Sequence, residues 1–132
     1  MMKNEWSSAW KGSKRPGKQR KYRANAPLHI KRKFLSVHLT KELRAKYSRR
    51  AVPIRSGDKV KVLVGSHRGH AGKIDRISIK AGKVYVTGIE VMRKDGSKVM
   101  PPINPSNLMI TELNLGDKRR EAMLARTVQR EK

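Results

Sequence analysis

The stretch VGSHRGHAGKI, residues 64–74, gathers the side chains that could do chemistry. A serine, two histidines and an arginine lie among three glycines at positions 65, 69 and 72. A serine beside a histidine could form a nucleophile, and two histidines three residues apart could bind a metal. A glycine-rich loop with basic neighbours could cradle a phosphate. The remaining alternative is a tight turn that presents its backbone to a partner.

Catalysis and metal binding fit the loop poorly. His67 and His70 would need further ligands, and the loop contains no Cys, Asp or Glu. The nearest acids are Asp58 and Asp75, and no motif links them to the histidines. Ser66 adjoins His67, but adjacent residues rarely face each other and no orienting acid is evident. We therefore expect two exposed loop histidines, no catalytic site and no metal site.

The phosphate-transfer alternative fails on local sequence. A nucleotide-binding P-loop continues from its last glycine into Lys and Ser or Thr, and then into a helix. Here Gly72 is followed by Lys73 and Ile74, at the start of a strand-like pattern. A turn remains, because glycines allow positive φ and let backbone N–H groups approach a phosphate or a base. A purely structural hairpin fits the same pattern, and the two interpretations are compatible.

The composition predicts an anionic partner. The 132 residues suit one domain, and with 36% hydrophobic and 5% aromatic residues the core should be small and aliphatic. The formal net charge is +23, from 33 Lys and Arg against 10 Asp and Glu. Such an excess repels itself unless nucleic acid, an anionic membrane or an acidic protein neutralises it.

Membrane insertion is the weakest of these alternatives, because the chain has no apolar run near the ~18 residues that a span needs. The N-terminus lacks the apolar stretch of a signal peptide. Without cysteine, disulfides and thiolate zinc sites are excluded. We expect a cytoplasmic protein.

The positive charge is concentrated towards the N-terminus. Residues 1–55 carry 17 Lys and Arg against 2 acids. We assign residues 1–38 to an extended basic arm, in which glycines and prolines between positions 12 and 27 discourage regular structure. A disordered solubilising tail is the alternative. Trp6, Trp10 and Tyr22 could stack on unpaired bases or pack on a neighbouring protein.

Two helices are predicted on either side of a β region. Residues 39–50 contain a short helix, about 40–49, that Thr40 can cap and that has Leu43 and Tyr47 on one face. Residues 116–132 form a basic C-terminal helix, about 118–130, which Asp117 caps.

The region between them, residues 51–115, has the pattern of short strands. KVKVLV, 59–64, alternates valine with other residues, and KIDRISI, 73–79, and KVYVTGIEV, 83–91, are further strands. DGSK, 95–98, is a hairpin turn and LMI, 108–110, a last strand. Closely spaced strands with glycine turns predict a mainly β protein, a small antiparallel barrel.

Three separated motifs resemble one known family. SGDKVKVLVGSHRGHAGKIDRI, 56–77, resembles the KOW motif, which occurs in small SH3-like barrels that bind RNA or the transcription and translation machinery. NAPLHIKRKFLSVHLTKELRAKYSRRAVPIR, 25–55, and INPSNLMITELNL, 103–115, resemble the flanks of that barrel in large-subunit ribosomal protein twenty-four of archaea, called twenty-six in eukaryotes. The resemblance spans about residues 14–120. It departs where Val64 and Arg68 replace a frequent Arg and Lys, and it leaves Trp6 and Trp10 unmatched.

The resemblance implies a structural constituent of the large ribosomal subunit, without enzymatic activity or cofactor. The family binds the 5′ domain of large-subunit rRNA, acts early in assembly and lies near the polypeptide exit tunnel. Neighbouring ribosomal proteins would be further partners, and we expect neither membrane insertion nor a homo-oligomer.

The RNA-binding residues that we expect fall into three groups. Those of the arm are Lys14, Arg15, Lys18, Arg20, Lys21 and Arg23, followed by Lys31, Arg32 and Lys33. Those lining the approach to the barrel are Arg44, Arg49, Arg50 and Arg55. Those of the barrel loop are Gly65, Ser66, His67, Arg68, Gly69 and Lys73.

Two other functions are less consistent with the sequence. A KOW-containing transcription elongation or RNA-binding factor would need another domain before the barrel, and residues 1–55 are too basic and too poor in aliphatics to supply one. An enzyme acting on RNA would need clustered acids or a histidine–acid site, whereas the 10 acids are scattered.

Overall fold

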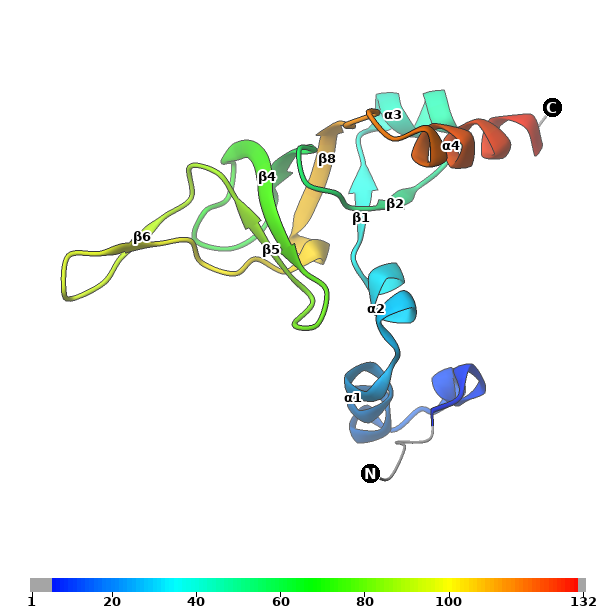
Figure 1. Ribbon diagram of the computed structural model, residues 1–132, viewed down its shortest axis with the longest axis horizontal. Coiled ribbons are helices and arrows are strands. Elements are labelled where there is room, and N and C mark those ends of the chain that lie inside the picture. The colour runs from blue at the N-terminus through cyan, green and yellow to red at the C-terminus, as the bar shows by residue number, and fades with distance from the viewer. Residues whose placement is uncertain (1–5, 131–132) are drawn as a thin grey trace.

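The computed structural model describes residues 6–130 and contains a six-stranded sheet from which an N-terminal arm projects (Figure 1). The strand order is β2-β1-β8-β3-β4-β5. The strands are β1 (Ser36–Leu39), β2 (Ala51–Pro53), β3 (Lys59–Val62), β4 (Ala71–Ser78), β5 (Lys83–Val86) and β8 (Leu108–Glu112). A separate hairpin of β6 (Val91–Met92) and β7 (Lys98–Val99) extends away from the sheet.

The sheet forms because its sequence alternates. In β3, Val60 and Val62 are buried, whereas Lys59 and Lys61 face solvent. The core on the buried side is aliphatic, as the composition predicts. Its members are Leu35, Val37, Leu39, Val52, Ile54, Val60, Val62, Ile74, Val84, Val86, Ile89, Ile103, Leu108, Ile110 and Leu124.

Four α-helices occur within residues 6–130: α1 (Pro16–Asn25), α2 (Leu28–Phe34), α3 (Lys41–Tyr47) and α4 (Lys118–Arg130). Two 3₁₀ turns, η1 (Ser8–Gly12) and η2 (Pro105–Asn107), complete the elements. The helices predicted near 40–49 and 118–130 are confirmed as α3 and α4. The N–H of Arg119 donates to Asp117 Oδ1 over 3.0 Å, so Asp117 caps α4 as predicted.

The arm departs from the extended conformation that we expected for residues 1–38. Pro16 begins α1, where its missing N–H breaks no helical hydrogen bond, and Pro27 immediately precedes α2. Prolines therefore separate the arm helices without preventing them. The arm still projects beyond the sheet (Figure 1), and η1, α1 and α2 contain no buried residue. Residues 36–38, which we also assigned to the arm, belong to β1 of the sheet.

The prediction of a mainly β, antiparallel barrel is only partly correct. Helices contain more residues than strands, and β1 pairs in parallel with β8. The other pairings in the sheet are antiparallel. Within the described residues no ladder joins the edge strands β2 and β5, although a single bridge links Val84 to Ile103. Pairing across β1 requires the chain to return from the far end of the sequence, which strand periodicity does not encode.

Candidate nucleic-acid interface

The loop between β3 and β4 is a tight turn, as the glycines predict. Gly65 and Gly69 have φ values of 108° and 86°, in the region that favours glycine. The N–H of Gly69 donates to the carbonyl of Val62, and the N–H of Val62 donates to the carbonyl of His70, both over 2.9 Å. These bonds close the loop at its base and present residues 64–66 and Arg68 to solvent.

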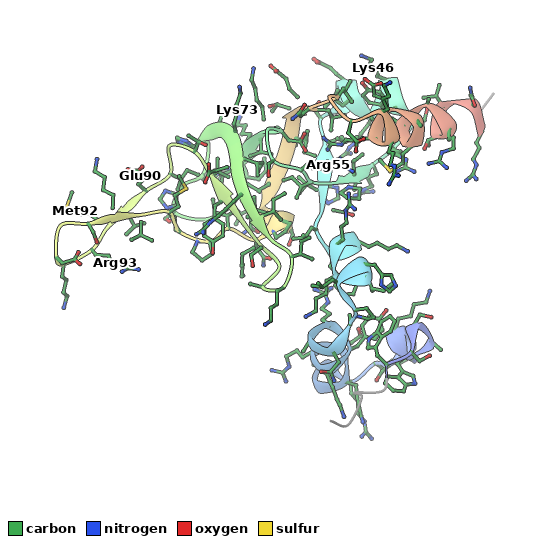
Figure 2. All side chains as sticks on the ribbon, viewed as in Figure 1. Lys46, Arg55, Lys73, Glu90, Met92 and Arg93 are labelled. Atoms are coloured by element: carbon green, nitrogen blue, oxygen red, sulfur yellow. The ribbon has the colours of Figure 1, made fainter. Side chains whose placement is uncertain are left out.

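This turn presents unpaired donors beside positive charge. The backbone N–H groups of residues 64–67 have no acceptor within residues 6–130. The side chains of Ser66, Arg68 and Lys73 are exposed, and Lys73 lies near the beginning of β4 (Figure 2). Free N–H groups next to cations can receive phosphate oxygens.

The loop histidines are half-buried rather than exposed, contrary to our expectation. His70 packs over Gly88, where an added Cβ would lie 3.1 Å from its Nε2. An added Cβ on Gly72 would lie 2.6 Å from the carbonyl oxygen of Thr87. Gly72 therefore lets β4 approach the end of β5 closely, a packing role that spacing alone did not reveal. Among residues 6–130 no three His, Cys, Asp or Glu side chains form a potential metal group.

The arm places a second set of cations on the surface. Among the arm residues predicted to bind RNA only Lys31 is half-buried, whereas the others are exposed: Lys14, Arg15, Lys18, Arg20, Lys21, Arg23, Arg32 and Lys33. The amide of Gln19 donates to the carbonyls of Lys11 and Ser13 over 2.8 and 2.6 Å. These bonds hold the segment before α1 against the helix.

A cleft of about 420 Å³ separates the arm from the turn between β4 and β5. Arg23 and Lys31 line it from the arm, and Lys80 and Lys83 line it from the turn. Phe34 lies in the same cleft, with the Arg23 guanidinium 5.5 Å from its ring centroid. Our sequence interpretation missed Lys80 and Lys83. The signal was KAGK, 80–83, a turn with a cation at each end.

Most of the arginines expected to line the approach are engaged within the protein. The Nε of Arg44 donates to the carbonyl of Leu39 over 2.9 Å, and the Nε of Arg49 donates to Thr127 Oγ1 over 2.6 Å. Arg55 forms an ion pair with Asp117. Arg50 alone of the four is exposed. The bond of Arg44 joins α3 to β1, whereas those of Arg49 and Arg55 join the segments on either side of β2 to α4 and its cap.

The sequence interpretation also missed a buried ion pair. Arg120 donates from Nη1 to Asp58 Oδ1 over 2.6 Å and from Nη2 to Oδ2 over 2.7 Å, and both side chains are at most 2% exposed. Asp58 also accepts from the backbone N–H groups of Arg55 and Asn114. Each carboxylate oxygen of Asp58 thus accepts two hydrogen bonds, and those from Arg120 hold α4 against the sheet. The sequence feature that could have indicated this ion pair is Gly57-Asp58, an acid directly before a strand.

Two solvent-accessible carboxyls have a lowered pKa. The backbone N–H of Arg119 is the main cause of the lowered pKa of Asp117, and the Arg55 side chain adds to it. Backbone and side-chain hydrogen bonds from Ser97 lower the pKa of Asp95 in the turn between β6 and β7. Both carboxylates cap local structure, so neither has the environment of a general acid or base.

Apart from Arg50, the exposed residues among those predicted form two groups rather than three, because the other arginines of the approach are bonded within the protein. The turn after β3 lies at the beginning of β4, and the cleft beside the arm lies at its end. An eight-residue strand is about 23 Å long at about 3.3 Å per step. We call these the loop surface (residues 64–68 and Lys73) and the arm surface (the exposed cations of residues 14–33 with Lys80 and Lys83).

Comparison with known proteins adds independent information. A sequence model of the family described as ribosomal proteins L26 of eukaryotes and their archaeal L24 counterparts matches residues 13–127. Several curated relatives carry the name "Large ribosomal subunit protein uL24". That of Methanospirillum hungatei is 47% identical over 86% of this chain and 94% of its own length. That of Methanosphaera stadtmanae is 44% identical over 88% and 99%, and that of Methanoculleus marisnigri is 48% identical over 85% and 93%.

No helix within the described part of the chain has the length and apolar character needed to cross a bilayer.

Proposed function

The chain belongs to the family of ribosomal proteins called L26 in eukaryotes and L24 in archaea, and we propose that it binds the 5′ domain of large-subunit rRNA during early subunit assembly. Family membership makes the chain a non-enzymatic structural constituent of the large ribosomal subunit, in the cytoplasm. Its partners are therefore ribosomal RNA and ribosomal proteins. The finer proposal concerns which RNA it binds, and how.

The observation that carries the proposal is the pair of basic surfaces at opposite ends of β4. Each can neutralise phosphates, and β4 sets the spacing between the loop surface and the Lys80 and Lys83 part of the arm surface. A protein of this shape holds two RNA segments at a set separation and offsets their mutual repulsion. That action suits an early assembly protein, because RNA segments must approach before later proteins bind. In the mature subunit we propose a position near the polypeptide exit tunnel, as the family resemblance implies.

We further propose that β3, β4, β5 and β8 are the body of a KOW-type SH3-like barrel. The antiparallel run β8-β3-β4-β5 supports this, since it contains the turn with the glycine pattern. The bridge between Val84 and Ile103 adds support, because Ile103 belongs to the segment that leads into β8. Through this contact the edge of β5 that does not pair with β4 meets the segment leading into β8, and β8 is the strand at the opposite end of the run.

The test is a binding titration of the full chain against a 5′-domain rRNA fragment across a salt series. An unrelated structured RNA of equal length is the reference. We expect a preference for the 5′-domain fragment that persists at physiological salt, with log K falling linearly with log salt concentration. Arg68→Ala should weaken binding to the fragment, whereas Lys118→Ala, at the exposed start of α4, is the matched control.

Equal affinity for the two RNAs at every salt concentration would refute specific 5′-domain binding. The chain would then be a cation-rich protein that requires the assembled particle for specificity. Loss of affinity in both Arg68→Ala and the Lys118→Ala control, to the same extent, would refute the loop surface as a distinct contact.

A further inference from the structure

The arm contains a hollow that phosphate neutralisation does not require. It encloses about 650 Å³ beside α1, and Trp6, Trp10 and Tyr22 form its aromatic wall. That volume lies within the usual range for sites that take small molecules. Aromatic residues are only 5% of this chain, so three around one hollow form a marked local concentration.

Part of the aromatic wall is fixed in place. The indole Nε1 of Trp6 donates to the carbonyl of Tyr22 over 3.1 Å, and the two ring centroids are 5.1 Å apart. Tyr22 in turn lies 6.1 Å from the ring of Phe34. Three aromatic rings thus form a row of tilted neighbours along the arm, and two of them, Trp6 and Tyr22, line the hollow.

The other part of the wall is unpaired. Trp10, on η1, is 51% exposed, and none of the ring pairs found within residues 6–130 includes it. An exposed indole in the same hollow as a fixed one offers a planar ligand an apolar face to stack on.

The rim of the hollow is cationic. Lys14, Arg15, Lys18 and Lys21 contribute to its lining. No Asp or Glu occurs between residues 6 and 41, so no internal anion competes for these side chains. A ligand that combines a planar apolar ring with negative charge fits this lining, and a nucleotide in a single strand has both.

We propose that this hollow takes an unpaired RNA base, stacked on Trp10, while Lys14, Arg15, Lys18 and Lys21 hold the flanking phosphates. This inference rests on the proposed function and adds a single-strand contact to it. Trp6 and Trp10 precede residue 13, where the family match begins, so the two indoles are not part of the matched family pattern, whereas the four cations lie within it. A protein ligand is less consistent with this lining. Beside an aromatic ring it would have to supply negative charge for four cations, as the phosphates that flank a base do.

Intrinsic fluorescence is a direct readout, because the chain's only two tryptophans both line the hollow. The full chain is titrated with an unstructured single-stranded RNA oligonucleotide. A blunt duplex of that sequence and inorganic polyphosphate are compared at equal phosphate concentration. We expect saturable quenching by the single strand and much weaker quenching by the other two. Equal quenching by all three would overturn the proposal, because the hollow would then respond to charge alone.

Substitutions separate stacking from charge, with affinity measured by the anisotropy of labelled RNA. Trp10→Ala should weaken single-strand binding about tenfold and leave duplex binding unchanged, and Trp10→Phe should keep most of the affinity. Met92→Ala is the matched control, since Met92 is 69% exposed on the distant β6 hairpin (Figure 2). Circular dichroism checks that each variant keeps its helices. Unchanged single-strand affinity in Trp10→Ala would overturn the proposal.

The proposed function and the hollow fail in different ways. If the hollow is wrong but rRNA binding is right, Trp10→Ala binds both the single strand and the 5′-domain fragment as the unsubstituted chain does. If 5′-domain specificity is wrong but the hollow is right, the single strand still quenches the tryptophan fluorescence. The 5′-domain fragment then binds no more tightly than the unrelated RNA. A third result is that RNA leaves the tryptophan fluorescence unquenched but the binding of ribosomal proteins shields the tryptophans from solvent. That result would overturn the proposal and indicate a protein ligand.

Discussion

Asp58 and Arg120 join segments that lie 62 residues apart, through two charged hydrogen bonds in a dry environment. The Nε of Arg120 has no partner within the described residues, but both carboxylate oxygens of Asp58 are bonded to Arg120 and to the backbone. Forming such a pair requires both ions to lose water, so its net contribution to stability is modest. Removing one partner is costly, because the other charge stays buried.

We therefore predict that Asp58→Ala lowers the free energy of unfolding by about 3–5 kcal/mol. Arg120→Met should lower it by a similar amount, since it leaves the carboxylate buried. Urea denaturation followed by circular dichroism measures both. The double variant should lose less than the sum of the two single losses, because neither charge then remains alone.

An exposed ion pair provides the control for that prediction. Lys59 Nζ and Glu112 Oε2 lie 2.7 Å apart, but the side chains are 47% and 65% exposed. Solvent screens such a pair, so Glu112→Gln should change stability by less than about 1 kcal/mol. A loss in Glu112→Gln as large as that in Asp58→Ala would contradict the role of burial.

Asp117 should make stability depend on pH. Its folded pKa lies below the ordinary value, chiefly through the N–H of Arg119, so its contribution is present above the unfolded pKa of about 4. The contribution disappears as the pH falls through the folded pKa. We predict that Asp117→Asn has a lower Tm than the unsubstituted chain at neutral pH, and that the difference shrinks below about pH 4. Thermal unfolding at several pH values measures this, and a difference independent of pH would contradict it.

At the scale of the elements, the approach of β4 to the end of β5 depends on Gly72. A methyl group at this position would lie 2.6 Å from the Thr87 carbonyl oxygen and 3.0 Å from a methyl of Val86. Strand backbones cannot yield as a flexible side chain can. We predict that Gly72→Ala destabilises the fold by about 1–3 kcal/mol in urea denaturation.

Gly69→Ala is the comparison for this prediction. Its φ of 86° adds backbone strain, but an added Cβ would meet nothing within 4 Å. The expected cost is about 1–2 kcal/mol, without displacement of the strands. Amide hydrogen exchange separates the two variants, since only Gly72→Ala should loosen the pairing of β4 with β5. Faster exchange in that pairing for both variants would contradict the close-approach argument.

At the scale of the molecule, the arm and the sheet have separate tasks. The core cluster begins at Leu35 and ends at Leu124, so it takes no residue from η1, α1 or α2. We predict that deleting residues 1–27 changes Tm by only a few degrees but weakens RNA binding and reduces its salt dependence, since eight cations are removed. Thermal unfolding and the salt series measure the two effects.

The two surfaces should also act independently in that deletion. They flank opposite ends of β4, a strand about 23 Å long, so the losses from the deletion and from Arg68→Ala should add within about 0.5 kcal/mol. A deletion that unfolds the sheet would contradict the separation of tasks. A strongly non-additive pair would instead indicate that both surfaces hold one RNA segment.

The sequence alone determined the features that depend on neighbouring residues. Alternating valines predicted β3, the capping residue Asp117 predicted the start of α4, and the glycines predicted the turn after β3. Charge predicted a polyanionic partner, and three motifs in order predicted the family. These inferences succeeded because each depends on local conformational preference or on a pattern read along the chain.

Tertiary structure decided what depends on distant residues. The parallel pairing of β1 with β8, the burial of Asp58 against Arg120 and the internal bonds of Arg49 and Arg55 join segments far apart in sequence. The division of the basic residues between the two ends of β4 has the same origin. Charge and periodicity specify what a residue can do, but which residues meet is set by the packing that buries the most apolar surface without stranding a polar group.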